Sequence, residues 1–165
     1  MPNPDTSATS TGLIDPRGPR FGAVITSVLL VVVLVLGPTS VPGLIVLLVQ
    51  TVAFAAGSLL GLHTQPWGVI YRKFVRPRLA APTELEPAEP PRFAQTVGLV
   101  FSGTALILSA TGFGLAAQIV TGVLIAAAFA ECAFGFCLGC VVFGYLQRAG
   151  VIPDTVCEAC NRVGA

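Results

Sequence analysis

The chain contains apolar stretches that are too long to be the buried elements of a soluble domain. Two of them cover most of residues 21–36 and 43–62, and a third stays apolar over nearly the whole of 93–146. A helix needs about 20 apolar residues to cross roughly 30 Å of hydrocarbon. Only 10% of the residues are charged, against roughly 25% in an ordinary soluble domain. These features exclude a soluble monomeric enzyme and predict an integral membrane protein.

The longest apolar stretch must contain more than one crossing. A turn-forming Thr-Gly-Phe-Gly sequence lies near its middle, at 111–114, and divides it into two spans. The part after this turn is still too long for one helix across the bilayer. We therefore expect a glycine-rich break near Gly135, Gly139 or Gly144, with an extension along the membrane surface to residue 147.

The predicted fold class is all-α: a polytopic membrane protein with four transmembrane helices. The spans are expected at about 21–37, 43–63, 94–112 and 116–140. Around them we expect a disordered N-terminal tail over 1–14, a membrane domain over 15–148, and a cytoplasmic C-terminal tail over 149–165.

The basic residues indicate how the chain is oriented. All nine lie before the first span, between the second and third spans, or after the fourth span. The two short connections, at 37–42 and 111–115, contain none. Because cytoplasmic loops carry the excess of Lys and Arg, both termini and the long middle loop are expected in the cytoplasm. At the start of that loop, Trp67 and Tyr71 beside Arg72 and Lys73 predict an interfacial membrane anchor.

A short motif is repeated at the start of the first and third spans. Pro19-Arg20-Phe21 precedes one, and Pro91-Arg92-Phe93 precedes the other. The motif is consistent with a tandem repeat of two helices, whose copies would run in the same direction across the membrane. It is equally consistent with a generic helix entry, in which proline starts the helix and arginine extends to the interface.

Five cysteines gather near the end of the chain. Cys137 and Cys140 form one CxxC unit, Cys157 and Cys160 form a second, and Cys132 stands alone. On the cytoplasmic side structural disulfides are rare, so paired thiols favour a redox or metal-binding role. The gap between the two units also fits a zinc site with Cys137, Cys140, Cys157 and Cys160 as ligands.

Two further interpretations of the cysteines are open. The spacing of Cys132, Cys137 and Cys140 matches that of plant-type iron–sulfur clusters, although the surrounding sequence lacks loop character. Cys132 on its own is typical of a small apolar residue packed in a helix.

Three polar residues stand out in or beside the spans. Glu131 is the only acid in a span, and a carboxylate there must be paired, protonated or hydrated; it is a candidate proton acceptor for the thiols. His63 closes the second span and is expected to face water, with a contact to Glu131 or the cysteines as the alternative. Gln50 lies in the middle of the second span and is expected to hydrogen-bond to Ser or Thr of a neighbouring helix.

Three stretches of the chain resemble an uncharacterised family of bacterial four-helix inner-membrane proteins that share a domain of unknown function. They are Asp15–Phe21, the segment from Trp67 through Arg76-Pro77-Arg78 to Phe93, and the GFCxGC motif at 135–140. The resemblance implies company with thioredoxin-like or rhodanese-like proteins, but no established activity. Pro87–Arg92 departs from Asp15–Arg20, so a paired Asp and Arg is not expected in the second half.

These observations together predict thiol–disulfide exchange or sulfur relay, with Cys137 and Cys140 as the catalytic pair, at the cytoplasmic face of the bacterial inner membrane. The alternative is a non-enzymatic membrane anchor or accessory subunit whose cysteines are structural or bind zinc, the one cofactor considered. A small transporter is a third possibility, although Glu131 is the only charge inside a span. Expected partners are the lipid bilayer, a soluble thiol or sulfurtransferase protein or a larger membrane complex, and a second copy of the chain. No nucleic-acid partner is expected.

Overall fold

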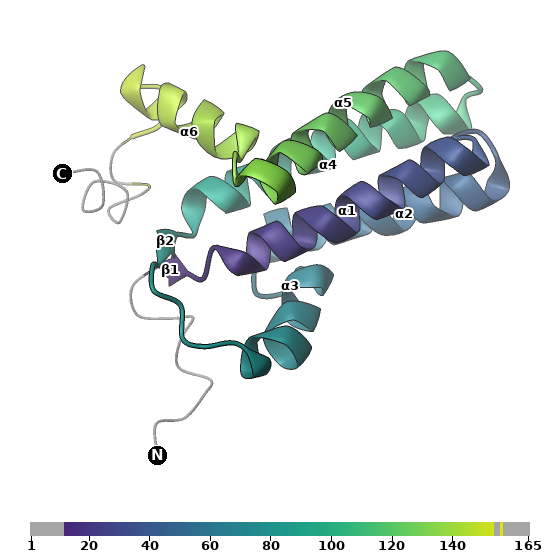
Figure 1. Cartoon of the computed structure of the whole chain (residues 1–165). Coiled ribbons are helices and arrows are strands. Elements are labelled where there is room, and N and C mark those ends of the chain that lie inside the picture. Colours follow the sequence, from purple (N-terminus) through teal and green to yellow (C-terminus); the bar gives the residue numbers. More distant parts are fainter. Residues whose placement is uncertain (1–11, 154–155, 157–165) are drawn as a thin grey trace.

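A computed structural model describes residues 12–153 and 156 of the chain. It is mostly helical (Figure 1). Four helices are long and apolar enough to cross a membrane. They are α1 (Arg17–Leu36), α2 (Val41–Ala55) with its π-helical continuation η2 (Ala56–Leu60), α4 (Glu89–Ala110) and α5 (Gly114–Phe134). The predicted all-α fold with four membrane-spanning helices is therefore confirmed.

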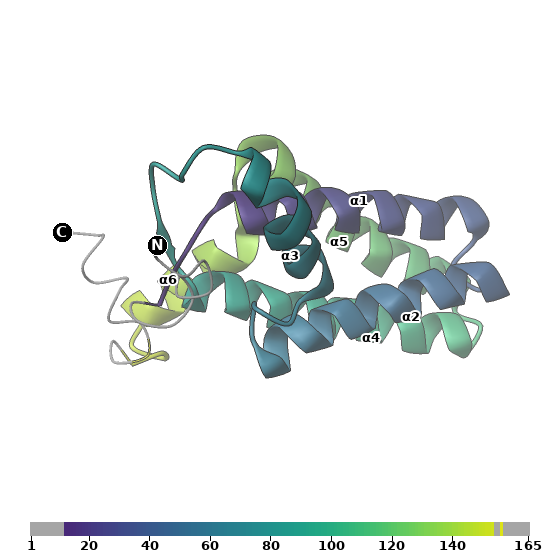
Figure 2. The same cartoon turned by 90° about the horizontal axis from the view of Figure 1, so that it is seen from below.

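The four long helices form a bundle in which each contacts two others. Helix α1 packs against α2 and α5, and α4 packs against the same two helices (Figures 1 and 2). The core of the bundle is apolar and consists of Leu30, Val33, Leu47, Phe54, Ala105 and Leu124. Gln50 is fully buried beside this core, and its Nε2 donates to Oγ1 of Thr26 at 3.0 Å. The hydrogen bond expected between Gln50 and a neighbouring helix is thus present.

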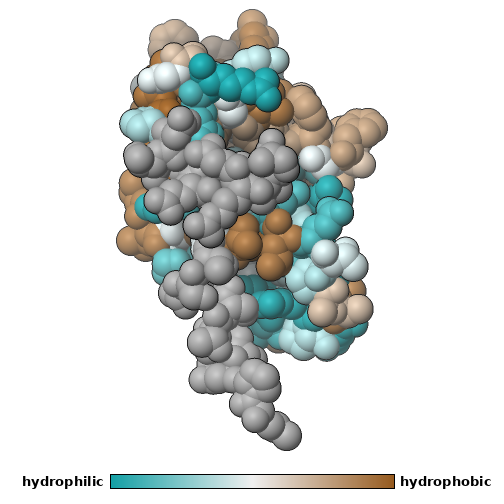
Figure 3. Space-filling view, turned by 90° about the vertical axis from the view of Figure 1, so that its left-hand side faces the viewer, coloured by the Kyte–Doolittle hydropathy of each residue, from teal (hydrophilic) through white to brown (hydrophobic). Residues whose placement is uncertain are grey.

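The remaining elements lie at one end of the bundle (Figure 1). The short strands β1 (Leu13–Ile14) and β2 (Glu86–Pro87) pair antiparallel. Between α2 and β2 lie α3 (Pro66–Ile70), the π-helical η3 (Tyr71–Val75) and the 3-10 turn η4 (Arg76–Arg78); after α5 comes α6 (Leu138–Arg148). Seen from this end, hydrophilic side chains gather on the surface, with apolar patches between them (Figure 3).

Two short helical arms extend from this end. The first arm is α3 with η3, residues 66–75, and it packs on α1; the second arm is α6, and it packs on α4. The segment between the second and third spans was predicted to be a long cytoplasmic loop, so the helices of the first arm differ from that prediction. Tyr71 was predicted as an interfacial anchor, but only 3% of it is exposed. Its ring packs on Phe21 and its hydroxyl donates to Asp15, so it belongs to the interior.

The helix bounds also differ from the predicted spans. Helices α1 and α4 begin before residues 21 and 94 because the polar and proline-containing turns ahead of the apolar stretches are already helical. Proline fits a first turn, where its missing N–H has no partner in the helix. The span predicted to reach residue 140 ends at Phe134 instead.

Candidate functional site

The break after α5 creates the site. Gly135 adopts a left-handed conformation with φ of 66°. Its N–H donates to the carbonyl of Glu131, and the N–H of Phe136 donates to the carbonyl of Ala130. The bond from Gly135 closes the helix as in an αL motif, for which glycine is favoured because it has no Cβ. The chain then turns away, and α6 begins three residues later.

The first CxxC unit lies where the chain re-enters a helix. Cys137 is the N-cap of α6, and its Sγ accepts a hydrogen bond from the backbone N–H of Cys140 at 3.3 Å. The two residues form a disulfide, with their Cα atoms 5.2 Å apart. A sulfur at this position faces the free N–H groups and the positive end of the helix dipole, which favour a thiolate when the bond is reduced.

The other cysteines do not share this arrangement within the described residues. Cys132 is a half-buried free thiol whose Sγ contacts the carbonyl of Phe129, one turn earlier in α5. The iron–sulfur interpretation required Cys132, Cys137 and Cys140 together, and among the residues that the structure describes no group of three metal-binding side chains forms. Cys157 and Cys160 lie outside the described residues, so the four-cysteine zinc site remains a prediction.

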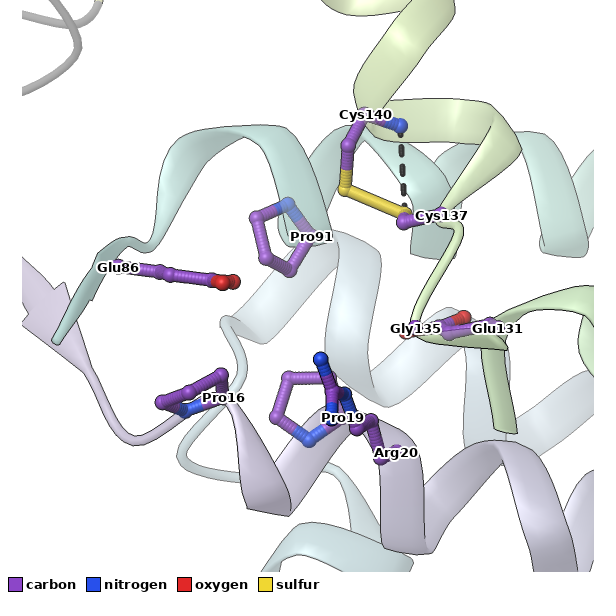
Figure 4. A pocket seen from close by; sticks show the side chains of 9 residues that line it. All are labelled: Pro16, Pro19, Arg20, Glu86, Pro91, Glu131, Gly135, Cys137 and Cys140. Atoms are coloured by element: carbon purple, nitrogen blue, oxygen red, sulfur yellow. Dashed lines mark hydrogen bonds between the residues drawn. A yellow bond between two sulfur atoms is a disulfide. The ribbon is translucent and has the colours of Figure 1, made fainter. Parts of the chain in front are cut away.

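A recess beside the disulfide brings several elements together (Figure 4). Helix α1 contributes Arg20, β2 contributes Glu86, and α5 contributes Glu131. The full lining consists of Pro16, Pro19, Arg20, Glu86, Pro91, Glu131, Gly135, Cys137 and Cys140. Residues from both halves of the chain therefore line one recess together with the disulfide.

The charges in the recess are of both signs. Arg20 reaches into it from α1, and the Glu86 carboxylate points into it from β2 (Figure 4). The guanidinium of Arg20 lies against Gly135, so close that a Cβ at this position would collide with it. Glycine at 135 thus provides both the helix end and the space for Arg20. The recess thus places one guanidinium and two carboxyl groups beside the disulfide.

The structure separates some of the predicted residues and adds others. It places Glu131 in the same recess as Cys137 and Cys140, as one interpretation of the sequence required. His63 is exposed and does not line the recess; its backbone carbonyl accepts from Arg72 of the first arm. Arg20 and Glu86 were not among the predicted site residues. The repeated Pro-Arg-Phe motif marked Arg20, but only the folded bundle brings it to the cysteines.

Sequence comparison assigns the chain to a family. The model of the family described as Domain of unknown function (DUF4395) matches residues 14–148. The chain belongs to this family. No curated protein and no solved structure matches it.

The DUF4395 match covers most of the described structure. It extends from β1 to the end of α6 and includes every residue that lines the recess, among them Cys137 and Cys140. It ends before Cys157 and Cys160. The recess with its disulfide is therefore part of the DUF4395 domain, whereas the second CxxC unit lies beyond the matched residues.

Proposed function

We propose that the chain is an integral membrane protein that exchanges thiols and disulfides with a soluble partner through Cys137 and Cys140. The observation that carries this proposal is the disulfide at the N-terminus of α6, with Cys137 as the N-cap and both residues lining an open recess. Redox-active CxxC pairs need access and a stabilised thiolate. The recess gives a partner access to the sulfur atoms, and the helix N-terminus stabilises the thiolate.

The proposed location is the cytoplasmic face of the inner membrane. The described basic residues lie at the end of the bundle that carries the arms and the recess, and the turns at the other end contain none. The positive-inside rule places this end in the cytoplasm. A disulfide there meets a reducing environment, which favours a cycling pair over a permanent structural link.

The proposed exchange consumes the thiols of a partner dithiol. A partner thiolate attacks Sγ of Cys137, a mixed disulfide forms, and Cys140 leaves as a thiolate. The second partner thiolate then attacks the partner's sulfur of the mixed disulfide and releases Cys137. The chain ends as a dithiol and the partner as a disulfide, so two electrons pass from the partner to the chain; the reverse sequence oxidises the chain. A thioredoxin-like protein, or a rhodanese-like protein acting by sulfur relay, is the proposed partner class.

Redox titration tests this proposal. The full chain, reconstituted in lipid nanodiscs, is equilibrated in reduced and oxidised glutathione, and its free thiols are counted by alkylation and mass spectrometry. We expect Cys137 and Cys140 to be oxidised and reduced together and reversibly. Cys140→Ser is expected to trap a mixed disulfide through Cys137 with a thioredoxin whose second active-site cysteine is replaced by serine, because no thiol then remains to resolve it; Cys132→Ser, the control, is expected to behave like the parent. A pair that neither reduces nor forms a mixed disulfide contradicts the proposal.

The competing proposal is an accessory membrane subunit whose cysteines bind zinc. It rests on the spacing of the two CxxC units in the sequence. Zinc content of the purified protein decides between the two. One zinc ion per chain, lost in Cys137→Ser and in Cys157→Ser alike, supports the zinc proposal and contradicts exchange at Cys137 and Cys140.

A further inference from the structure

The two halves of the bundle correspond to each other at several positions. The ring of Phe21 lies 5.7 Å from that of Tyr71, and the ring of Phe93 lies 5.7 Å from that of Phe143. The interval along the chain from Phe21 to Phe93 equals that from Tyr71 to Phe143. Each pair joins an arm to the helix on which it packs. The same interval separates the first residues of α1 and α4, so the repeated motif belongs to a repeated structure.

The same interval relates the caps of the two arms. In the first arm, the side chain of Gln65 accepts from the N–H of Gly68; in the second, the side chain of Cys137 accepts from the N–H of Cys140. The disulfide therefore occupies a capping position that the fold contains twice. In the first half this position carries an amide and a glycine and has no redox chemistry.

The two arginines of the repeated motif also correspond. Arg92 donates from Nε to the carbonyl of Ser58 at 3.1 Å and from Nη2 to that of Leu59 at 3.5 Å, near the end of η2. Its counterpart Arg20 lies against Gly135, at the end of α5. Each arginine thus reaches the end of a helix from the other half, where a cation is favourable beside the C-terminal carbonyls.

Only Arg20 has redox-active neighbours. Where the first half places Leu59, Gln65 and Gly68, the second half places Glu131, Cys137 and Cys140. The charged groups that line the recess with the two cysteines are Arg20 from α1, Glu131 from α5 and Glu86 from β2. Arg20 is the single cation among the residues that line the recess.

We infer that Arg20 is a positioning residue of the redox pair, and that its guanidinium stabilises the thiolate of Cys137, which the exchange releases in its second step. This inference rests on the proposed exchange function. A cation near a thiolate favours the charged form. Since the thiolate belongs to the reduced protein, Arg20 also shifts the equilibrium toward reduction. Arg92, the counterpart of Arg20, also reaches the end of a helix, but no cysteine that the structure describes lies beside that helix end. Arg92 therefore serves as a matched control.

The direct test is the pH dependence of alkylation at Cys137. The full chain carries Cys137 as its only cysteine, with serine at the other four positions, and reacts with iodoacetamide in nanodiscs between pH 5 and 10. Arg20→Gln is expected to move the midpoint upward by about half a pH unit, a modest shift because Arg20 is exposed to solvent. At pH values well below the midpoint, this shift makes the alkylation of Cys137 roughly threefold slower. Arg92→Gln should leave the pH midpoint at the value of the parent, and Arg20→Lys should keep it close to that value.

A second measurement guards against a variant that merely folds poorly. With Cys137 and Cys140 both present, Arg20→Gln should need a roughly threefold more reducing glutathione ratio for half reduction, whereas Arg92→Gln should not. Equal shifts in the two variants, or none in Arg20→Gln, overturn the inference. If the parent fails to exchange with thioredoxin while Arg20→Gln still moves the midpoint, the exchange function fails and the role of Arg20 stands.

Discussion

Tyr71 is a single residue that fixes the first arm to the entry of α1. Its hydroxyl donates to Oδ2 of Asp15 at 3.1 Å, and the N–H of Arg17 donates to Oδ1 of the same carboxylate. Burial and the adjacent Asp15 carboxylate raise the pKa of Tyr71 above its ordinary value. In the second half its counterpart is Phe143, which makes the same ring contact without a hydroxyl. The hydrogen bond is therefore a feature of the first arm alone.

The change Tyr71→Phe should lower stability near neutral pH by about 1–2 kcal/mol, because the hydrogen bond to a carboxylate is lost while the ring contact remains. The hydroxyl of Tyr71 has a pKa of about 10 in the unfolded chain and a higher pKa in the folded chain. Its contribution to the free energy of unfolding is fully present below the unfolded pKa and is lost as pH rises through the folded pKa. The parent should thus lose more stability than the variant between pH 9 and 11. Thermal unfolding in detergent at several pH values measures the stability of the parent and of the variant.

Tyr145→Phe is the control for this comparison, since Tyr145 is 67% exposed. It should leave stability within about 0.5 kcal/mol of the parent. The assignment of the alkaline loss to Tyr71 is contradicted if Tyr71→Phe retains the parent's full loss of stability above pH 9.

The long helices and the arms differ in how far the sequence predicts them. Apolar length determines a membrane span, so α1, α2, α4 and α5 were recognisable from composition alone. The arms lack that signal, because their positions depend on packing against α1 and α4. The disulfide pair was predictable from the CxxC spacing. Arg20 and Glu86 were not, because they come from distant parts of the chain and meet the cysteines only through the strand pair and the bundle.

The second arm depends on a close contact between α6 and α4. A Cβ at Gly139 would collide with the backbone and side chain of Ala94, whereas a Cβ at Gly144, in the same helix, would meet nothing within 4 Å. Gly139→Ala should therefore destabilise the arm by about 1–3 kcal/mol, since α6 must move away from α4. Gly144→Ala should be neutral or stabilising by up to about 1 kcal/mol, because alanine favours a helix.

Limited proteolysis within α6 measures the effect of these two glycines, with unfolding temperature as a second readout. Gly139→Ala should be cleaved faster than the parent, and Gly144→Ala should not. Equal protection of both variants would show that α6 is held by other contacts, such as that of Phe143 with Phe93.

At the scale of the whole molecule, the repeat explains why the bundle has two different ends. Both copies enter from the same end, where β1 pairs with β2 and joins the entries of α1 and α4. The arms, the recess and the arginines of both motifs follow from that shared entry. At the opposite end, the described residues form two tight turns, between α1 and α2 and between α4 and α5 (Figures 1 and 2). The asymmetry in charge between the ends is therefore built into the repeat, and by the positive-inside rule it predicts which side of the membrane the disulfide faces.

Cysteine labelling tests that orientation. In a chain with all native cysteines replaced by serine, Phe113→Cys places a thiol in a turn between α4 and α5, and Leu79→Cys places one after η4; both positions are exposed. In whole bacterial cells, a maleimide that does not cross the inner membrane should label Phe113→Cys at once and Leu79→Cys only after the membrane is permeabilised. The physical reason is that Lys and Arg are retained on the cytoplasmic side. The reverse pattern would place the redox pair on the outer face, where an oxidising environment would make the disulfide a structural link.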